Sequence, residues 1–198
     1  MQTQQSTPQL CSVIDAAYKI GMLQRRKELE PFCTWLSNFH IKNFCEIGVW
    51  HGASFTIWDA LSEPGEHIAI DPNSQQGIIL TPQQLAARQN RFSTLKPTVS
   101  MLMMDSQRAS TRQAVEDILD CQKLDLLFID GDHSQHACYH DYIVYGQFMR
   151  KGGVIALHDV DLYPGCKTIW RDLSAHNPNT KHWVDPHETS GIGAIIVD

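Results

Sequence analysis

The chain has 198 residues, a hydrophobic fraction of 42% and a net charge of −6 at pH 7. This length fits a single domain whose core needs no disulfide or metal to hold it together. The acidic balance argues against a nucleic-acid partner and against attraction to a membrane surface. No apolar run approaches the roughly 20 residues of a membrane span.

The amino terminus and the cysteines predict a cytoplasmic protein. The first ten residues, MQTQQSTPQL, lack the basic and apolar segments of a secretory signal. The six cysteines show no CxxC spacing, and several lie in apolar segments, as free thiols do in a reducing compartment.

The first 40 residues predict a helical N-terminal cap. Apolar residues recur at helical spacing between residues 9 and 40, which indicates two helices. Pro31 suits the first turn of the second helix. Residues 41–198 then form the main part of what we expect to be one globular domain.

From residue 43 onward, strand patterns alternate with helix patterns, which predicts βαβ units and a largely parallel sheet. The last two strands are too close in sequence for a crossover helix and should form an antiparallel hairpin. We therefore expect an α/β, Rossmann-like, doubly wound sheet of about seven strands. The expected strands are 43–48, 66–71, 98–104, 124–130, 152–158, 182–184 and 192–197, and the expected helices are 53–61, 81–91, 110–119, 135–150 and 166–176.

Polar and acidic residues gather where these strands end. Ligands of doubly wound sheets bind at the carboxyl ends of the strands, so these residues are the candidates for chemistry. They are Glu46, Gly48, Gly52, Ser54, Asp71, Asp105, Ser106, Asp130, Asp132, His133, His158 and Asp159.

The turn after the first strand reads E-I-G-V-W-H-G-A-S. Gly48 allows a sharp turn and Gly52 a close packing of helix on strand. The second glycine of the dinucleotide fingerprint and the P-loop lysine are both absent, which disfavours ligands rich in phosphate. Asp71 follows Gly48 by 23 residues, close to where a ribose-binding acid is expected.

The run E-I-G-x-x-x-G-x-S, the acid ending the second strand, and FIDGDH with GGVIALHDV resemble class I S-adenosylmethionine-dependent methyltransferases. The nearest likeness is to the branch of small O-methyltransferases and cephalosporin-hydroxylase-like proteins, over residues 40–198. The resemblance implies the strand order 3-2-1-4-5-7-6. It also implies a cofactor site in which Glu46, Gly48 and Gly52 flank the methionine end, Asp71 holds the ribose, and Asp105 with Ser106 lies near the adenine; we add Ser54 and Asp130 from the same rim.

The same resemblance implies a divalent metal held by Asp130, His158 and Asp159. Mg²⁺ prefers oxygen ligands, whereas His158 stands where relatives carry an acid or an amide. An imidazole there favours Mn, Fe or Zn, or removes the site. His133, three residues after Asp130, occupies the place of the general base. We therefore expect His133 and Asp130 to be catalytic.

These residues together predict transfer of a methyl group from S-adenosylmethionine to a small hydroxylated acceptor. The acceptor site should come from the N-terminal helices, from short loops or from the second subunit of a homodimer. One alternative is a non-haem-iron oxygenase or metal hydrolase that uses Asp130, His133 and His158. Another is a non-catalytic protein that binds the cofactor.

Overall fold

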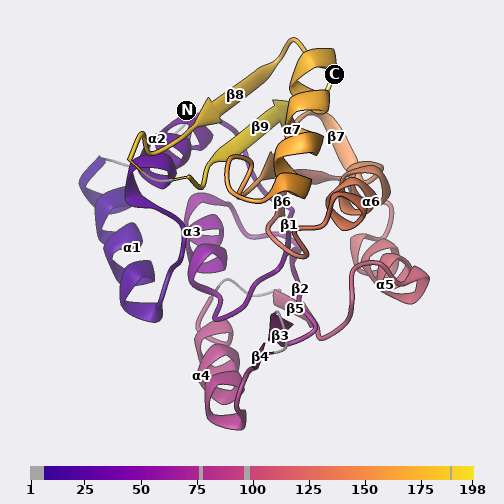
Figure 1. Cartoon of the computed structure of the whole chain (residues 1–198). Coiled ribbons are helices and arrows are strands. Elements are labelled where there is room, and N and C mark those ends of the chain that lie inside the picture. Colours follow the sequence, from indigo (N-terminus) through magenta and orange to yellow (C-terminus); the bar gives the residue numbers. More distant parts are fainter. Residues whose placement is uncertain (1–6, 76–77, 96–98, 188) are drawn as a thin grey trace.

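A seven-stranded sheet forms the centre of the molecule, because the apolar strand runs are buried on both faces (Figure 1). The computed structural model describes residues 7–75, 78–95, 99–187 and 189–198. Residue 98, the first of the expected third strand, lies outside these ranges.

The order of elements along the chain alternates as the sequence predicts. The helices are α1 (Thr7–Ile20), α2 (Arg26–Leu36), α3 (Ala53–Leu61), α4 (Pro82–Phe92), α5 (Ala109–Leu119), α6 (Gln135–Gly146) and α7 (Pro164–His176). The strands are β1 (Phe44–Ile47), β2 (His67–Ile70), β3 (Ser74–Gln75), β4 (Ile78–Ile79), β5 (Val99–Leu102), β6 (Leu124–Ile129), β7 (Met149–Leu157), β8 (Thr180–Trp183) and β9 (Ile192–Ile196).

The sheet has the order β5-β2-β1-β6-β7-β9-β8. Numbered among themselves along the chain, its seven strands follow 3-2-1-4-5-7-6, as expected. The first five run parallel, and β9 pairs antiparallel with both β7 and β8. The antiparallel pair of β3 and β4, which the sequence pattern did not predict, stands apart from this sheet. The α/β class and the C-terminal hairpin are thus confirmed.

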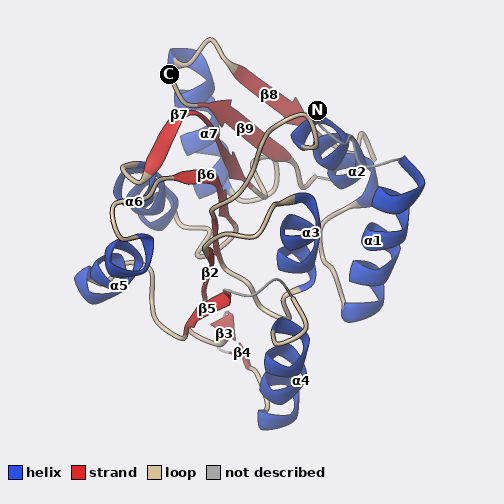
Figure 2. Cartoon of the chain, turned by 180° about the vertical axis from the view of Figure 1, so that it is seen from behind, coloured by secondary structure: helices blue, strands red, loops and turns tan. Residues whose placement is uncertain are grey.

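Helices cover both faces of the sheet and bury a separate apolar cluster on each (Figure 2). Side chains of α1, α2 and α3 pack on one face, against Phe128 and Ala156 among others. Side chains of α5, α6 and α7 pack on the other, against Ile129 and Ile155. In the part of the chain described, no helix is both long and apolar enough to cross a membrane.

Two neighbouring boundaries are wrong by three to four residues. The helix expected at 135–150 ends at Gly146, and β7 begins at Met149 because Met149 pairs with Leu124 of β6. Backbone pairing, a long-range interaction, therefore takes residues that the local pattern gave to the helix.

Pro31 is not in the first turn of α2 but in its interior. The helix starts earlier because the backbone N–H of Arg25 donates to Glu28 Oε1 at 2.9 Å, which caps the helix end. Leu29 and Phe32 are fully buried on either side of the proline, and this packing outweighs its missing N–H donor.

Candidate active site

A cavity of about 690 Å³ opens at the carboxyl ends of β1, β2 and β6. This is the place where a doubly wound sheet binds its ligands, and the volume lies in the usual range for small-molecule sites. Its walls come from the segment joining α1 to α2, the turns after β1, β2 and β6, the loop after β5, and the start of α7. Of the predicted cofactor residues, those that line it are Gly48, Ser54, Asp71, Asp105, Ser106 and Asp130.

Gly48 brings the ends of β1 and β6 together. Its φ is +85°, and a Cβ there would lie 2.0 Å from the carbonyl oxygen of Asp130. The backbone N–H of Asp130 also donates to the carbonyl oxygen of Ile47 at 2.8 Å. A glycine is therefore needed for both the left-handed turn and the close approach of the two strands.

Asp71 holds the turn after β1 as well as facing the cavity. Its Oδ2 accepts hydrogen bonds from the backbone N–H groups of Val49 and Trp50 at 2.9 and 2.6 Å, and Oδ1 accepts one from Asn73 at 2.5 Å. Buried Arg88 lies 3.7 Å from Oδ1. A carboxylate has about four acceptor positions, so Asp71 keeps capacity for a ligand hydroxyl.

Glu46 lies behind the cavity wall rather than in it. It is fully buried and accepts a hydrogen bond from the hydroxyl of Ser54, which does line the cavity. Burial raises the pKa of Glu46 well above its usual value, although the Ser54 hydrogen bond opposes this. Ser106 also lines the cavity, and its hydroxyl donates to Asp141 Oδ2 at 3.1 Å.

Gly52 is absent from the cavity wall, contrary to its predicted role in cofactor binding. Its φ is +81°, and a Cβ there would lie 2.7 Å from the ring of Phe92 at the end of α4. Gly52 therefore allows α3 to pack closely against α4. Its influence on the cofactor site is indirect, because it sets the conformation of the turn after β1.

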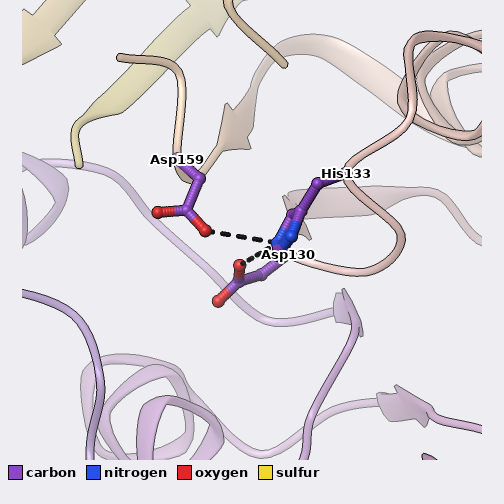
Figure 3. A group of neighbouring side chains, drawn as sticks. All are labelled: Asp130, His133 and Asp159. Atoms are coloured by element: carbon purple, nitrogen blue, oxygen red, sulfur yellow. Dashed lines mark ion pairs between the residues drawn. The ribbon is translucent and has the colours of Figure 1, made fainter. Parts of the chain in front are cut away.

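Asp130 and His133 line one side of the cavity, and Asp159 lies close beside them (Figure 3). Each offers a ligand atom, and these atoms lie within 4.8 Å of one another. His133 Nε2 lies 3.2 Å from Asp159 Oδ2 and 3.8 Å from Asp130 Oδ1. This nitrogen is buried without a hydrogen-bond partner among the described residues. Asp159 has the left-handed φ of +58°, a conformation often found at functional sites.

His158 does not join this group. Its Nδ1 lies 3.1 Å from Asp130 Oδ1, and its Nε2 lies 2.9 Å from Glu28 Oε1, so both ring nitrogens face carboxylates. Burial opposes protonation of the ring, but Asp130 and Glu28 outweigh it and raise the pKa of His158 well above its usual value. His158 Nδ1 also lies 3.5 Å from Asp159 Oδ1, but the group of possible metal ligands contains His133 rather than the predicted His158.

The charges of the two histidines act on the aspartates differently. Burial pushes the pKa of Asp130 upward, but His158 and His133 outweigh it and lower that pKa from 3.8 to about 2. Burial raises the pKa of Asp159, with His158 opposing. The Tyr163 ring stacks on His133, with centroids 4.0 Å apart and planes 13° from parallel. The lowered pKa favours the ionised form of Asp130 at neutral pH, next to the His133 ring that stacks on Tyr163.

Two site residues were not predicted from the sequence, and both belong to the N-terminal cap. Gln24 Nε2 donates to Asp130 Oδ2 at 2.6 Å, and Glu28 meets His158 as described. In the sequence, Glu28 reads as an ordinary acid in the first turn of a helix. No local pattern indicates a partner more than a hundred residues away.

The geometry does not form the ligand set of a non-haem-iron site. That set would need Asp130, His133 and His158 to direct lone pairs at a common point. Among the described residues, the possible metal ligands that lie together are Asp130, His133 and Asp159, and His158 is outside this group, with its Nε2 2.9 Å from Glu28 Oε1.

A cofactor cavity at the switch point of a 3-2-1-4-5-7-6 sheet defines the class I S-adenosylmethionine-dependent methyltransferase fold. The family model for a methyltransferase domain matches residues 45–160, and the chain belongs to this family. A curated relative is an uncharacterized protein, R132, of Acanthamoeba polyphaga mimivirus, 28% identical over 143 residues. The match covers 67% of this chain and 61% of that protein, so the chain spans about three fifths of its length.

Solved structures with low identity share the fold. An rRNA methylase from Streptococcus thermophilus superposes with a TM-score of 0.63 at 10% identity, covering 90% of this chain and all of that one. An O-methyltransferase from Bacillus cereus, solved in complex with SAH, superposes with a TM-score of 0.61 at 18% identity, covering 97% of this chain and 91% of that one.

Proposed function

We propose that this chain transfers the methyl group of S-adenosylmethionine to a hydroxyl oxygen of a small acceptor. The observation that carries the proposal is the position of Asp130. It follows β6 directly, lines the cavity beside the turn after β1, and lies close to His133 and Asp159. A cofactor in that cavity would therefore have acid–base and metal-binding groups at its side. Membership of the methyltransferase family supports the same donor.

The donor end of the site suits a nucleoside without phosphates. Asp71 faces the cavity with acceptor capacity for a ribose hydroxyl, and Asp105 and Ser106 line the wall beyond β5. In the turn after β1, the backbone N–H groups of Val49 and Trp50 donate to Asp71 Oδ2, so they are not available to bind a phosphate.

The acceptor end is built largely by the N-terminal cap. Met22, Leu23 and Gln24 line the cavity, and the Leu23 side chain is 61% exposed at this wall. This favours the N-terminal helices, among the three sources considered above, as the origin of the acceptor site. The net charge of −6 favours a small molecule over RNA. A second subunit stays a prediction.

In the reaction, the acceptor oxygen attacks the methyl carbon while the carbon–sulfur bond breaks, which leaves S-adenosylhomocysteine. The acceptor hydroxyl gives up its proton. Because the sulfonium is already an activated electrophile, the chain contributes mainly by holding the oxygen in line and receiving that proton.

Asp130, His133 and Asp159 fit a divalent metal ion. The fit rests on His133 Nε2, which is buried between two carboxylates without a hydrogen-bond partner in the described part of the chain. One imidazole and two carboxylates suit Mn²⁺ or Fe²⁺ better than Mg²⁺. A bound ion of this kind lowers the pKa of an acceptor hydroxyl.

The same nitrogen of His133 supports a second mechanism for the same reaction. Without a metal, it can accept the proton of the acceptor hydroxyl as a general base, with Asp159 stabilising the resulting cation at 3.2 Å. The two mechanisms differ in what chelation does.

Calorimetry with S-adenosylmethionine and S-adenosylhomocysteine tests the donor assignment first, and binding of neither would refute it. Release of S-adenosylhomocysteine is then measured with a panel of small hydroxylated acceptors, with and without EDTA. Loss of turnover on chelation and in Asp159→Asn supports the metal. Turnover that survives chelation but is lost in His133→Ala assigns His133 as the base, and Asp159→Asn should then lower the rate without abolishing it, because Asp159 only stabilises the resulting cation.

A further inference from the structure

Helix α2, in the N-terminal cap, carries a buried carboxylate, Glu28, that points toward the site. Glu28 has no exposed surface, although carboxylates in the first turn of a helix usually reach solvent. Burying a carboxylate is unfavourable unless hydrogen bonds compensate for the lost water. The contacts of Glu28 therefore indicate what its burial achieves.

Three groups hold Glu28 in one orientation. Its Oε1 accepts from the backbone N–H of Arg25 at 2.9 Å and lies 2.9 Å from His158 Nε2. Its Oε2 accepts from the hydroxyl of Ser190 at 2.8 Å. Arg25 lies just before α2, His158 just after β7, and Ser190 just before β9, so Glu28 joins three parts of the chain.

His158 connects Glu28 to Asp130, so the fixed orientation of Glu28 also restrains Asp130. Its ring is held at Nε2 by Glu28 and at Nδ1 by Asp130 Oδ1, 3.1 Å away. Asp130 Oδ2 accepts from Gln24 at 2.6 Å. The N-terminal cap thus holds both oxygens of Asp130. Gln24 holds Oδ2 directly, and Glu28 holds Oδ1 through His158.

We propose that Glu28 is a positioning residue of the methyl-transfer site, which acts through His158 to hold the Asp130 carboxylate toward His133 and Asp159. The inference rests on the proposed function of that carboxylate as a metal ligand. Groups that orient metal ligands in this way commonly contribute 10- to 100-fold to metal affinity. Helix α2 is then part of the reaction machinery and not merely a cover for the sheet.

Length and charge at position 28 separate this role from a purely electrostatic one. Glu28→Asp keeps the charge but is shorter by one methylene, so it cannot reach Arg25, His158 and Ser190 together. Glu28→Gln keeps the length and the acceptor oxygen toward His158 but removes the charge. Both changes are small enough to preserve α2, and Glu28 lies outside the wall of the cofactor cavity.

The test titrates Mn²⁺ into the full-length protein and its two variants and follows free Mn²⁺ by electron paramagnetic resonance. Calorimetric binding of S-adenosylhomocysteine, measured on the same samples, reports an intact fold and donor site. We expect Mn²⁺ affinity to fall about 10- to 100-fold in Glu28→Asp and to be largely retained in Glu28→Gln, with unchanged S-adenosylhomocysteine binding in both.

Glu28→Asp binding Mn²⁺ as tightly as the unaltered protein overturns the proposal. So does the reverse order, in which Glu28→Gln loses affinity and Glu28→Asp retains it, because charge rather than position would then matter. If the unaltered protein binds S-adenosylhomocysteine but no Mn²⁺, the role of Glu28 falls together with the metal, while the donor assignment stands. If S-adenosylhomocysteine does not bind either, the proposed function itself is refuted.

Discussion

Gly48→Ala tests whether the close approach of β1 and β6 builds the cofactor cavity. The backbone at Gly48 has a φ of +85°, and an alanine in this left-handed region costs about 1–2 kcal/mol. Its methyl group would start 2.0 Å from the Asp130 carbonyl oxygen, whereas real Cβ contacts essentially never fall below 3.0 Å. The end of β6 therefore has to move by about 1 Å, the difference between these two distances.

This displacement acts on both stability and binding. It weakens the 2.8 Å hydrogen bond from the Asp130 N–H to the Ile47 carbonyl, worth about 1 kcal/mol. With the strain at position 48, the free energy of unfolding should fall by about 2–3 kcal/mol, which lowers the melting temperature by about 4–12 °C in a chain of this size. Affinity for S-adenosylhomocysteine should fall as well, since Gly48 and Asp130 both line the cavity.

Differential scanning calorimetry and titration with S-adenosylhomocysteine measure the two effects. Gly146→Ala is the matched control: its Cβ would meet only Ile155 Cδ1, at 3.5 Å, and its backbone is not left-handed. It lies at the end of α6, where alanine is favoured over glycine by up to about 1 kcal/mol, so it should melt at the same temperature or higher. If Gly48→Ala has the same melting temperature as Gly146→Ala and binds S-adenosylhomocysteine with normal affinity, the close approach of β1 and β6 does not build the cavity.

Three further changes probe other parts of the site. Asp71→Asn should destabilise the protein by about 1–3 kcal/mol and weaken S-adenosylhomocysteine binding, because an amide has one acceptor oxygen where three backbone N–H groups now donate. Asp141→Asn should stabilise the protein at pH 8 by on the order of 3 kcal/mol and have little effect at pH 4. Burial raises the pKa of Asp141 from 3.8 to about 6, so the stability that its neutral form contributes is complete below pH 3.8 and is lost as the pH rises through 6. Gly165→Ala should lower Mn²⁺ affinity, because its Cβ would lie 2.3 Å from the carbonyl oxygen of His133 and displace that loop.

Each of these has a measurement that can contradict it. Thermal melts and calorimetric titrations check Asp71→Asn, and normal affinity at unchanged stability would show that the turn does not depend on the carboxylate. For Asp141→Asn, the stability difference from the unaltered protein is compared at pH 4 and pH 8, and an equal difference at both rules out the shifted pKa. Paramagnetic titration checks Gly165→Ala against Gly146→Ala, and equal Mn²⁺ affinities would mean that the His133 loop tolerates the added methyl.

Features that depend on near neighbours in the chain were predictable from the sequence. Buried strands of a parallel sheet must be continuously apolar, so LDLLFI marked β6 without any knowledge of its partners. Gly48 was recognisable because glycine adopts a left-handed backbone with little strain, whereas other residues in such a turn after a strand do not. The strand-end positions of Asp71 and Asp130 then followed from the rule that such sheets bind ligands at one edge.

Other features of the site were settled only by the packing of distant segments. The metal position was assigned to His158, whereas the possible ligand group contains His133, because the sequence does not show which way a loop turns a side chain after its strand ends. Gly52 was assigned to the cofactor because the ring of Phe92, 40 residues later, was not visible as its neighbour. Both differences concern direction in space rather than residue type.

The contribution of the N-terminal cap is the clearest case. The two helices predicted between residues 9 and 40 are present as α1 and α2, because the apolar spacing of a helix is local. Gln24 and Glu28 lie 106 and 130 residues from the side chains they contact, and those contacts exist only because α2 packs across the sheet beside β8 and β9. The sequence by itself determined a methyltransferase fold and the rim of its cofactor site. The tertiary structure decided which side chains hold Asp130, since only the packing of α2 on the sheet brings those groups within hydrogen-bonding distance.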